Sequence, residues 1–313
     1  MKPALLIDST EVLSRVGIRV AIDAVEAAFG ALHSGRIGTP VSVGVTVPDG
    51  SFHVKACAGE AGGIFVAKVN SNFPGNRSRD GLPTIQGVVA VFETASGRLR
   101  ALVDSPSVTA LRTAATTAVA LRHLAPAGAR VATVVGCGAL GRFHLEALAA
   151  CAFERVSVFD RVAARAEEAA RWARAGLGLD CTAVAEMRPA TLASPVVITC
   201  TTATEPFLGR EDVRAGTFVA AVGADSERKA EIAASLLAEA RIVTDSTEQC
   251  RRTGDLRNSA QGGARVCGEL ADAVAGRLAR TAGDEVVVFD STGLALEDLA
   301  VCALLVQGGP SRT

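Results

Sequence analysis

The 313-residue sequence has no tyrosine, one tryptophan and only 4% aromatic residues. Small and aliphatic side chains must therefore build the core, as is usual in proteins that combine helices with a parallel sheet. The chain also lacks a charge excess, since 32 lysines and arginines accompany 33 aspartates and glutamates. This balance gives no reason to expect nucleic acid or an anionic membrane as a partner.

Long apolar runs are missing too. No stretch approaches the ~18 apolar residues of a membrane-spanning helix. The first residues, MKPALLIDSTEV, become polar too soon for a signal peptide. We therefore expect a cytoplasmic chain of one or two domains that binds no membrane.

Cysteine occurs eight times but never as C-x-x-C, and the four histidines do not cluster with it. A metal site is therefore not expected. Reduced thiols, mostly buried as small apolar side chains, are the better interpretation.

A nucleotide-binding pattern stands between residues 130 and 160. Val131 to Val135 form an apolar, β-branched run that is typical of a buried parallel strand. Gly136, Gly138 and Gly141 follow at G-x-G-x-x-G spacing, and apolar residues then recur with helical period. A second short strand ends before Asp160.

Each residue of this pattern has a physical role in dinucleotide binding. Gly136 permits the tight turn, Gly138 allows the backbone to approach a pyrophosphate, and Gly141 allows close helix–strand packing. The N–H groups at the helix start face the phosphates. Asp160 is placed to accept both ribose hydroxyls. The spacing alone also fits an ordinary glycine turn, but its strand–helix–strand setting favours a dinucleotide.

The rest of the chain divides into two kinds of pattern. Before residue 104, a helical stretch broken near Gly17 precedes strands in an antiparallel pattern, with a long loop, NSNFPGNRSRDGLPT, between two of them. A helix from Thr109 to His123 then leads to the break Ala125–Gly128. Alternating strands and helices after that break predict a parallel sheet. The expected strands are 41–47, 52–58, 64–69, 85–93, 99–103, 131–135, 155–159, 195–200, 217–222, 241–244 and 286–289, and the last expected helix is 296–305.

Four further stretches could carry chemistry. Lys68 ends an apolar strand, so it is either a solvent-directed side chain or a buried amine in a cleft. GLPTIQG, residues 81–87, could be only a loop entering a strand. Arg112 lies among small apolar residues, which suggests that it points at an anion rather than at water. Asp225 follows a predicted strand end, where open α/β sheets bind ligands, although a helix N-cap is the structural alternative.

Taken in order, these stretches make the chain resemble the ornithine cyclodeaminase/mu-crystallin family over nearly its full length. The matching segments are AKVNSNFPGN, GLPTIQG, TALRTAAT, VVGCGALGRFHLEAL, VGAD and FDSTGLALEDLA. The resemblance implies an α/β fold in which a Rossmann-type parallel-sheet domain is inserted into an α+β substrate and dimerisation domain formed by both chain ends. The expected division is 1–125 with 286–313, and 126–285.

The resemblance also implies roles for single residues. Lys68 matches a substrate-site lysine, Arg112 a carboxylate-binding arginine and Asp225 the catalytic aspartate near the nicotinamide. Asp160 matches the ribose acid of NAD-using members, and its carboxylate would repel a 2′-phosphate. Arg161 is adjacent and suits that phosphate, so NADP stays an alternative to NAD. The expected cofactor contacts are Gly136, Gly138, Ala139, Leu140, Gly141, Asp160, Arg161, Thr201 and Thr113.

Two positions depart from the family pattern. Family members usually carry an arginine soon after a proline in the early strand, but none follows Pro40 in TPVSVGV. Ornithine-using members tend to have a glutamate on the next strand, where the alignment places Lys55. A lysine would repel a substrate ammonium, so Lys55 disfavours ornithine or lysine as substrate. It could instead replace the missing arginine as a contact to the substrate carboxylate, pair with a second acidic group on a different substrate, or face solvent.

The sequence therefore predicts an NAD(P)-dependent oxidoreductase of the imine reductase or amino-acid dehydrogenase type. Its expected substrate is a small carboxylate-bearing cyclic imine or imino/amino acid, and its expected assembly is a homodimer. One alternative is a cyclodeaminase that eliminates ammonia and recycles NAD. The other is a non-catalytic binding protein of mu-crystallin type.

Overall fold

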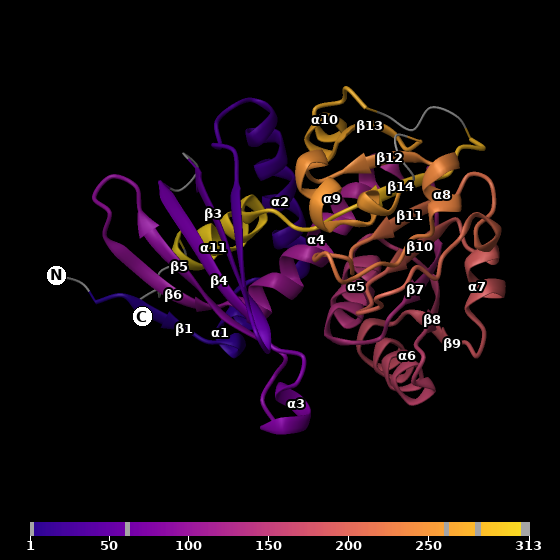
Figure 1. Ribbon diagram of the computed structural model, residues 1–313, viewed down its shortest axis with the longest axis horizontal. Coiled ribbons are helices and arrows are strands. Elements are labelled where there is room, and N and C mark those ends of the chain that lie inside the picture. The colour runs from indigo at the N-terminus through magenta and orange to yellow at the C-terminus, as the bar shows by residue number, and fades with distance from the viewer. Residues whose placement is uncertain (1–2, 60–62, 260–262, 279–282, 308–313) are drawn as a thin grey trace. The chain divides into compact units, whose positions relative to one another are not determined.

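A computed structural model describes residues 3–59, 63–259, 263–278 and 283–307 (Figure 1). The chain forms two compact units, one of residues 1–112 with 294–313 and one of residues 113–293. The first unit thus combines segments from both ends of the chain. Helix α4 (Ser105–Leu124) contributes residues to both units.

The first unit is built on a six-stranded sheet in the order β1-β6-β5-β4-β3-β2. All neighbouring strands are antiparallel except β1 and β6, which are parallel. The strands are β1 (Leu5–Ile7), β2 (Val41–Val47), β3 (Gly50–Gly59), β4 (Ile64–Asn72), β5 (Ile85–Glu93) and β6 (Leu99–Asp104). The helices are α1 (Ser9–Arg15), α2 (Ile18–His33), α3 (Asn76–Arg79) and α11 (Ala295–Gln307), besides the first turns of α4.

The two faces of this sheet differ sharply. Helix α11, yellow in Figure 1, packs against β3, β4 and α2, so the face beneath it is buried. Lys68, Val89 and Val103 are opposite one another in the register and are all buried on that face. The other face carries the alternate residues of each strand. Its exposed apolar side chains include Leu6, Val41, Val43, Val45, Phe52, Val54, Val69 and Val88.

The expected long loop after Lys68 was partly wrong. Strand β4 continues to Asn72, because Asn70, Ser71 and Asn72 pair in register with the first residues of β5. The segment that follows contains the short helix α3, within which the Asp80 N–H donates to the Asn76 carbonyl oxygen at 2.8 Å. Asparagine and serine weaken the strand pattern in the sequence, but backbone pairing does not depend on side-chain polarity.

The second unit is an eight-stranded parallel sheet in the order β13-β12-β14-β11-β10-β7-β8-β9. Its strands are β7 (Val131–Val135), β8 (Arg155–Phe159), β9 (Asp180–Ala183), β10 (Val196–Thr199), β11 (Phe218–Ala221), β12 (Arg241–Thr244), β13 (Arg265–Glu269) and β14 (Val287–Asp290). Its helical segments are α5 (Ala139–Ala150), α6 (Ala163–Leu177), α7 (Met187–Ala193), α8 (Ala234–Glu239), α9 (Thr247–Thr253) and α10 (Leu270–Val274), with the 3-10 turns η1 (Arg210–Asp212) and η2 (Asp255–Asn258).

Strand β14 enters this sheet late in the chain, between β11 and β12. The sequence placed the second domain boundary at residue 286, whereas the compact unit extends to Gly293. The chain then returns to the first unit as α11, which packs against α2, β3 and β4.

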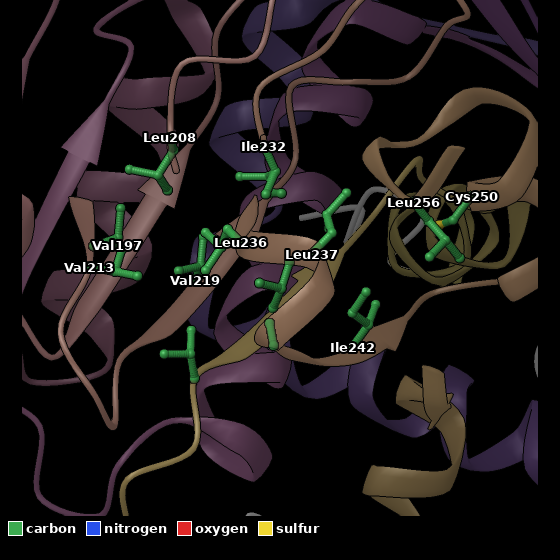
Figure 2. Packing of buried hydrophobic residues seen from close by; sticks show 14 of the residues in the cluster. Val197, Leu208, Val213, Val219, Ile232, Leu236, Leu237, Ile242, Cys250 and Leu256 are labelled. Carbon is green, nitrogen blue, oxygen red and sulfur yellow. The ribbon is translucent and has the colours of Figure 1, made fainter. Parts of the chain in front are cut away.

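An apolar cluster packs against one face of the parallel sheet (Figure 2). Val197 and Val219 come from neighbouring strands, and Ile232, Leu236 and Leu237 cover them from the segment around α8. All five side chains are fully buried. Burying an aliphatic side chain contributes about 1.5–3 kcal/mol, so this cluster fixes the segment that begins at residue 231.

In the described part of the chain, no helix combines the length and hydropathy needed to cross a bilayer.

Candidate active site

Two of the three loop glycines are required by the fold itself. Gly136 has φ +106°, and a Cβ there would lie 2.8 Å from the carbonyl oxygen of Cys200. A Cβ on Gly141 would collide with the carbonyl oxygen of Gly136. The turn after β7 and the close approach of α5 to this turn therefore both need glycine.

Gly138 differs, because a Cβ there would meet no atom within 4 Å. It is the N-cap residue of α5, and no side chain caps that helix start. The first N–H groups of a helix have no intrahelical partner and attract anions. The loop thus offers open space and uncapped amides side by side, which fits the pyrophosphate of a dinucleotide.

Asp160 lies at the end of β8, beside the glycine loop. One carboxylate oxygen accepts the Cys137 N–H at 2.9 Å and the other accepts the Val162 N–H at 2.9 Å. These bonds fix the carboxylate next to the glycine loop, where an acid that binds ribose hydroxyls is expected. Arg161, the next residue, is exposed.

The other expected cofactor contacts also lie in the second unit. Thr201 follows β10, and its hydroxyl oxygen accepts the Ala203 N–H at 3.1 Å. Thr113 is buried on α4, where its carbonyl oxygen accepts the hydroxyl of Thr117 at 3.2 Å. Strand β10 neighbours β7, so Thr201 and the glycine loop share the carboxyl edge of the sheet.

Lys68 is a buried amine, with only 2% of its surface exposed. Its Nζ lies 2.9 and 2.7 Å from the two carboxylate oxygens of Asp298 on α11. It also donates to the hydroxyl of Thr109 on α4 at 3.3 Å. This arrangement excludes the solvent-directed alternative for Lys68.

The surroundings lower the pKa of Lys68 from 10.5 to about 8. Burial is the largest cause, and the positive charges of Arg112 and Lys55 act in the same direction. Asp298 opposes them and stabilises the ammonium. The amine can therefore gain or lose a proton near neutral pH, as proton-transfer chemistry requires.

Arg112 is also buried and is paired within the first unit. Its Nη1 donates to Glu297 Oε2 at 2.7 Å, and its Nε lies 3.5 Å from Asp298 Oδ1. Glu297 has a second task, because its other oxygen accepts the Leu294 N–H at 2.9 Å at the start of α11. The helix start and the arginine are thus held by one carboxylate.

Lys55 is directly opposite Lys68 in the β3–β4 register, so the two side chains share the sheet face under α11. Lys55 is half-buried. Its charge reaches Lys68, since it lowers the pKa of that amine. Lys55 and Lys68 on the sheet and Arg112 on α4 therefore lie near one another beside α11, and all three were expected to contact substrate.

Asp225 belongs to the second unit, in the loop after β11. Its side chain is 48% exposed, and Lys229 Nζ donates to its Oδ1 at 2.7 Å. The structure thus groups Lys55, Lys68 and Arg112 in one unit, and the glycine loop, Asp160, Thr201 and Asp225 in the other.

Sequence reasoning missed the acidic partners of this site. Glu297 and Asp298 are both fully buried in the otherwise apolar helix ALEDLAVCALLVQ. Two adjacent acids in such a helix were a usable signal, because buried carboxylates need partners. Sequence reasoning also missed Glu231, a buried acid of the second unit that accepts the Thr201 N–H.

The fold and this geometry define a dinucleotide-dependent enzyme of the Rossmann type. In the described part of the chain no three metal-ligating side chains converge as a metal site requires, and all eight cysteines are free thiols.

Comparison with known proteins identifies the family of this chain. The ornithine cyclodeaminase/mu-crystallin family model matches residues 4–307, and the chain belongs to this family. An iminosuccinate reductase of Paracoccus denitrificans is 32% identical over 97% of this chain and 96% of its own. An archaeal alanine dehydrogenase dimer with bound NAD superposes with a TM-score of 0.91, at 28% identity over 97% of this chain and 95% of that one. The Δ1-pyrroline-2-carboxylate reductase of Thermococcus litoralis, solved with NADH and L-proline, also gives 0.91, at 27% identity over 97% and 96%. These findings confirm the family and the fold class that the sequence motifs indicated.

Proposed function

We propose that this protein is an NAD-dependent oxidoreductase that reduces a small carboxylate-bearing imine, cyclic or open, to the corresponding amino acid. The observation that carries the proposal is the buried Lys68, whose pKa of about 8 reflects a site built to exchange a proton. The relatives named above support it, because they act on imino or amino acids with a carboxylate beside the reacting carbon.

Arg112 and Lys55 bind the substrate carboxylate in this proposal. A guanidinium has five N–H donors, so Arg112 can contact Glu297 and a substrate carboxylate at once. Lys55 supplies the second positive charge on the same sheet face and takes the place of the arginine that is missing after Pro40.

Lys68 hydrogen-bonds the reacting centre, and Asp225 transfers the proton at the substrate nitrogen. Asp298 keeps the Lys68 ammonium oriented, with its Nζ 2.9 Å from Oδ1. The glycine loop and Asp160 would hold the cofactor, whose reduced form, NADH, would supply the hydride for imine reduction and whose oxidised form would accept it in reverse.

NAD is favoured over NADP because both oxygens of Asp160 are already ordered beside the glycine loop. A carboxylate in that position binds ribose hydroxyls and repels a 2′-phosphate. Arg161 is the one neighbouring residue that suits NADP.

The cyclodeaminase alternative is less well supported. Such an enzyme must accept a second, positively charged amino group, and Lys55 opposes Lys68 on the sheet face where that group would bind. The alternative of a non-catalytic binding protein is also less well supported, because binding alone does not require the buried Lys68–Asp298 pair.

The homodimer forms, in this proposal, through the uncovered face of the six-stranded sheet. Val41, Val43 and Val45 are 62%, 60% and 54% exposed there, and so broad an apolar face is a typical subunit interface. A Val45→Glu variant is expected to be monomeric by light scattering at micromolar concentration, whereas Val20→Glu on α2, at an equally exposed valine, stays dimeric. A monomeric wild type would contradict the proposed interface.

The same proposal treats residues 126–285 as the dinucleotide domain and residues 1–125 with 286–313 as the substrate and dimerisation domain. It places the protein in the cytoplasm, where free thiols remain reduced.

The test is an NADH-oxidation screen over cyclic imine carboxylates and over 2-oxo acids mixed with ammonia or methylamine. We expect stoichiometric NADH consumption with at least one of them, and weaker activity with NADPH. Ammonia release from ornithine or lysine without net NADH consumption would instead establish the cyclodeaminase. Tight NADH binding with no turnover of any substrate would favour the binding protein.

A further inference from the structure

Glu231 joins the ends of two strands of the parallel sheet. It is fully buried. Its Oε1 accepts the Thr201 N–H at 2.6 Å, and its Oε2 accepts the Gly223 N–H and the Thr199 hydroxyl, each at 2.8 Å. Thr199 is the last residue of β10, Thr201 lies in the loop that follows it, and Gly223 follows β11. One carboxylate therefore holds both loops at the carboxyl edge of the sheet.

The backbone of Glu231 is itself fixed. Its N–H donates to Asp255 at 2.7 Å, and its carbonyl oxygen accepts the N–H groups of Phe207 and Leu208 at 2.9 and 3.0 Å. The next residue, Ile232, is buried in the apolar cluster of Figure 2. The carboxylate is thus presented from a rigid base, so it can position what it binds.

The loop held by Glu231 carries Asp225. Residues 223 and 231 are its two ends, and the Gly223–Glu231 hydrogen bond closes it. Arg257 donates to the carbonyl oxygens of Ser226 and Lys229 inside the loop. A contact at the base of so short a loop fixes where Asp225 stands.

The Glu231 carboxylate lies in a space that exists only because residue 223 has no side chain. A Cβ on Gly223 would lie 2.5 Å from Glu231 Oε1 and 2.5 Å from the Thr201 carbonyl oxygen. Any larger residue at position 223 would push the carboxylate away from the two loops. Glycine is therefore needed at this point for contact with Glu231 rather than for an unusual φ.

We propose that Glu231 is a positioning residue for the reaction, because its ionised carboxylate aligns the Thr201 loop with the Asp225 loop beside the dinucleotide. This inference rests on the proposed function. Strand β7, which carries the glycine loop, neighbours β10, and β10 neighbours β11. Both loops thus lie at the edge where the cofactor is expected, and Glu231 acts through these loops.

The charge state of Glu231 makes the proposal testable. Burial, followed by the nearby Asp255 carboxylate, raises the pKa of Glu231 to about 7. The other titratable groups around it are Asp255 and Arg257 of η2, Asp290 of β14 beyond Asp255, the Cys200 thiol, and Asp225 and Lys229 of its own loop.

Protonation would loosen the arrangement. Both backbone N–H groups can only donate, and only the Thr199 hydroxyl can rotate to accept. A proton on Oε1 faces the Thr201 N–H, and a proton on Oε2 competes with the Gly223 N–H. The neutral acid therefore loses part of its hold on at least one loop.

The first test compares Glu231→Gln with wild type over pH about 5.5 to 8.5. With the imine found in the screen, kcat/KM of the variant should be lower by roughly tenfold to hundredfold at the alkaline end, as for loss of a hydrogen bond to a charged group. The difference in kcat/KM between wild type and variant should shrink to about twofold at the acidic end. There the carboxyl group of wild-type Glu231 is protonated and, like the glutamine, uncharged. A ratio that does not change with pH would mean that Glu231 is only structural.

Asp212→Asn is the matched control. Asp212 is also a buried acid of the second unit, and its Oδ2 accepts the Gly209 N–H at 2.8 Å rather than an N–H of either loop. Its replacement should give a ratio to wild type that is constant with pH.

A second variant keeps the test decisive if Glu231→Gln does not fold. Thr199→Val preserves shape and removes one hydrogen bond to the carboxylate. The acidic limb of the rate profile should then move to higher pH by up to about one unit, and an unmoved limb would overturn the proposal.

NADH affinity, measured by fluorescence titration, separates failure of this inference from failure of the proposed function. If the wild type reduces no imine, the proposed function fails, and the affinity ratio of Glu231→Gln to wild type still reports on the loops. The difference in NADH affinity between the two proteins should become smaller as the pH falls. A difference that does not change with pH would overturn the positioning role.

Discussion

The two units bury their charges in different ways. In the first, Lys68 and Arg112 are matched by Asp298 and Glu297, cation against anion. In the second, the carboxylate of Glu231 is held mainly by N–H and hydroxyl donors. The ion pairs keep two buried cations in fixed positions, whereas the backbone and hydroxyl donors let one carboxylate connect two loops.

Each unit contains one buried group whose pKa is shifted in the direction that favours its uncharged form. Burial lowers the pKa of Lys68 to about 8 and raises the pKa of Glu231 to about 7. In each case the ionised form is less favourable in the folded chain than in the unfolded one. Groups whose pKa is shifted toward neutral pH are typical of functional sites. Because Lys68 is held by an ion pair and Glu231 by hydrogen-bond donors, the two should respond differently to substitution.

The largest effect is expected for Lys68→Met, which breaks the ion-paired cluster. Loss of the proton-exchanging amine should lower kcat/KM by roughly a hundredfold to ten-thousandfold. Stability should also fall by about 3–5 kcal/mol, because Asp298 is left buried without its partner.

The double variant Lys68→Met/Asp298→Asn separates these two effects. Removing both charges should restore much of the melting temperature but none of the activity. Activity that returns with stability would show that Lys68 has only a structural role.

A smaller effect is expected for Glu231 and its hydrogen-bond donors, where the free energy of unfolding should depend on pH. The folded pKa of Glu231 is about 7 and its ordinary value is 4.5. The folded state therefore binds the extra proton between these values, so this contribution to stability is full below pH 4.5 and is lost as pH rises through 7.

Urea unfolding measures this contribution directly. Between pH about 4.5 and 7, wild type should lose up to about 3 kcal/mol relative to Glu231→Gln. Parallel curves for the two proteins would contradict the raised pKa. The predicted activity contribution has the opposite dependence, since the ionised carboxylate is the one that holds both loops.

The smallest effect concerns Lys55, which sharpens the role of the cationic face. Lys55→Met keeps the aliphatic stem and removes the charge, so KM for a carboxylate substrate should rise roughly tenfold to hundredfold with little change in melting temperature. Arg19→Met, at an exposed position on α2, controls for the loss of one positive charge. An unchanged KM would leave Arg112 and Lys68 as the anion contacts.

Much of the fold could be predicted from local pattern. Strands β2, β5, β7, β8 and β12 have the predicted bounds, because each is an apolar or alternating run between turn residues. Strands β9 and β13 were missed, since short mixed sequences such as Asp180–Ala183 carry no period and are stabilised by pairing with a neighbour.

The site was only partly predictable for a related reason. The glycine loop and Asp160 are local in sequence, and their surroundings fit the expected roles. The partners of Lys68 and Arg112 are 230 and 185 residues away, and no local pattern encodes such a distance. Whether Lys55 shares a face with Lys68 depends on strand register, which the packed sheet determines.

The most direct test of the account is an NMR titration of the lysine side chains, whose signals are few because the chain has only four lysines: Lys2, Lys55, Lys68 and Lys229. With lysine labelled in the side chain, Lys68→Met assigns the resonance of interest. The account predicts that this resonance titrates at about pH 8, well below the ordinary lysine value of about 10.4. A Lys68 that titrates near that ordinary value would contradict the claim that the site holds an amine ready for proton exchange.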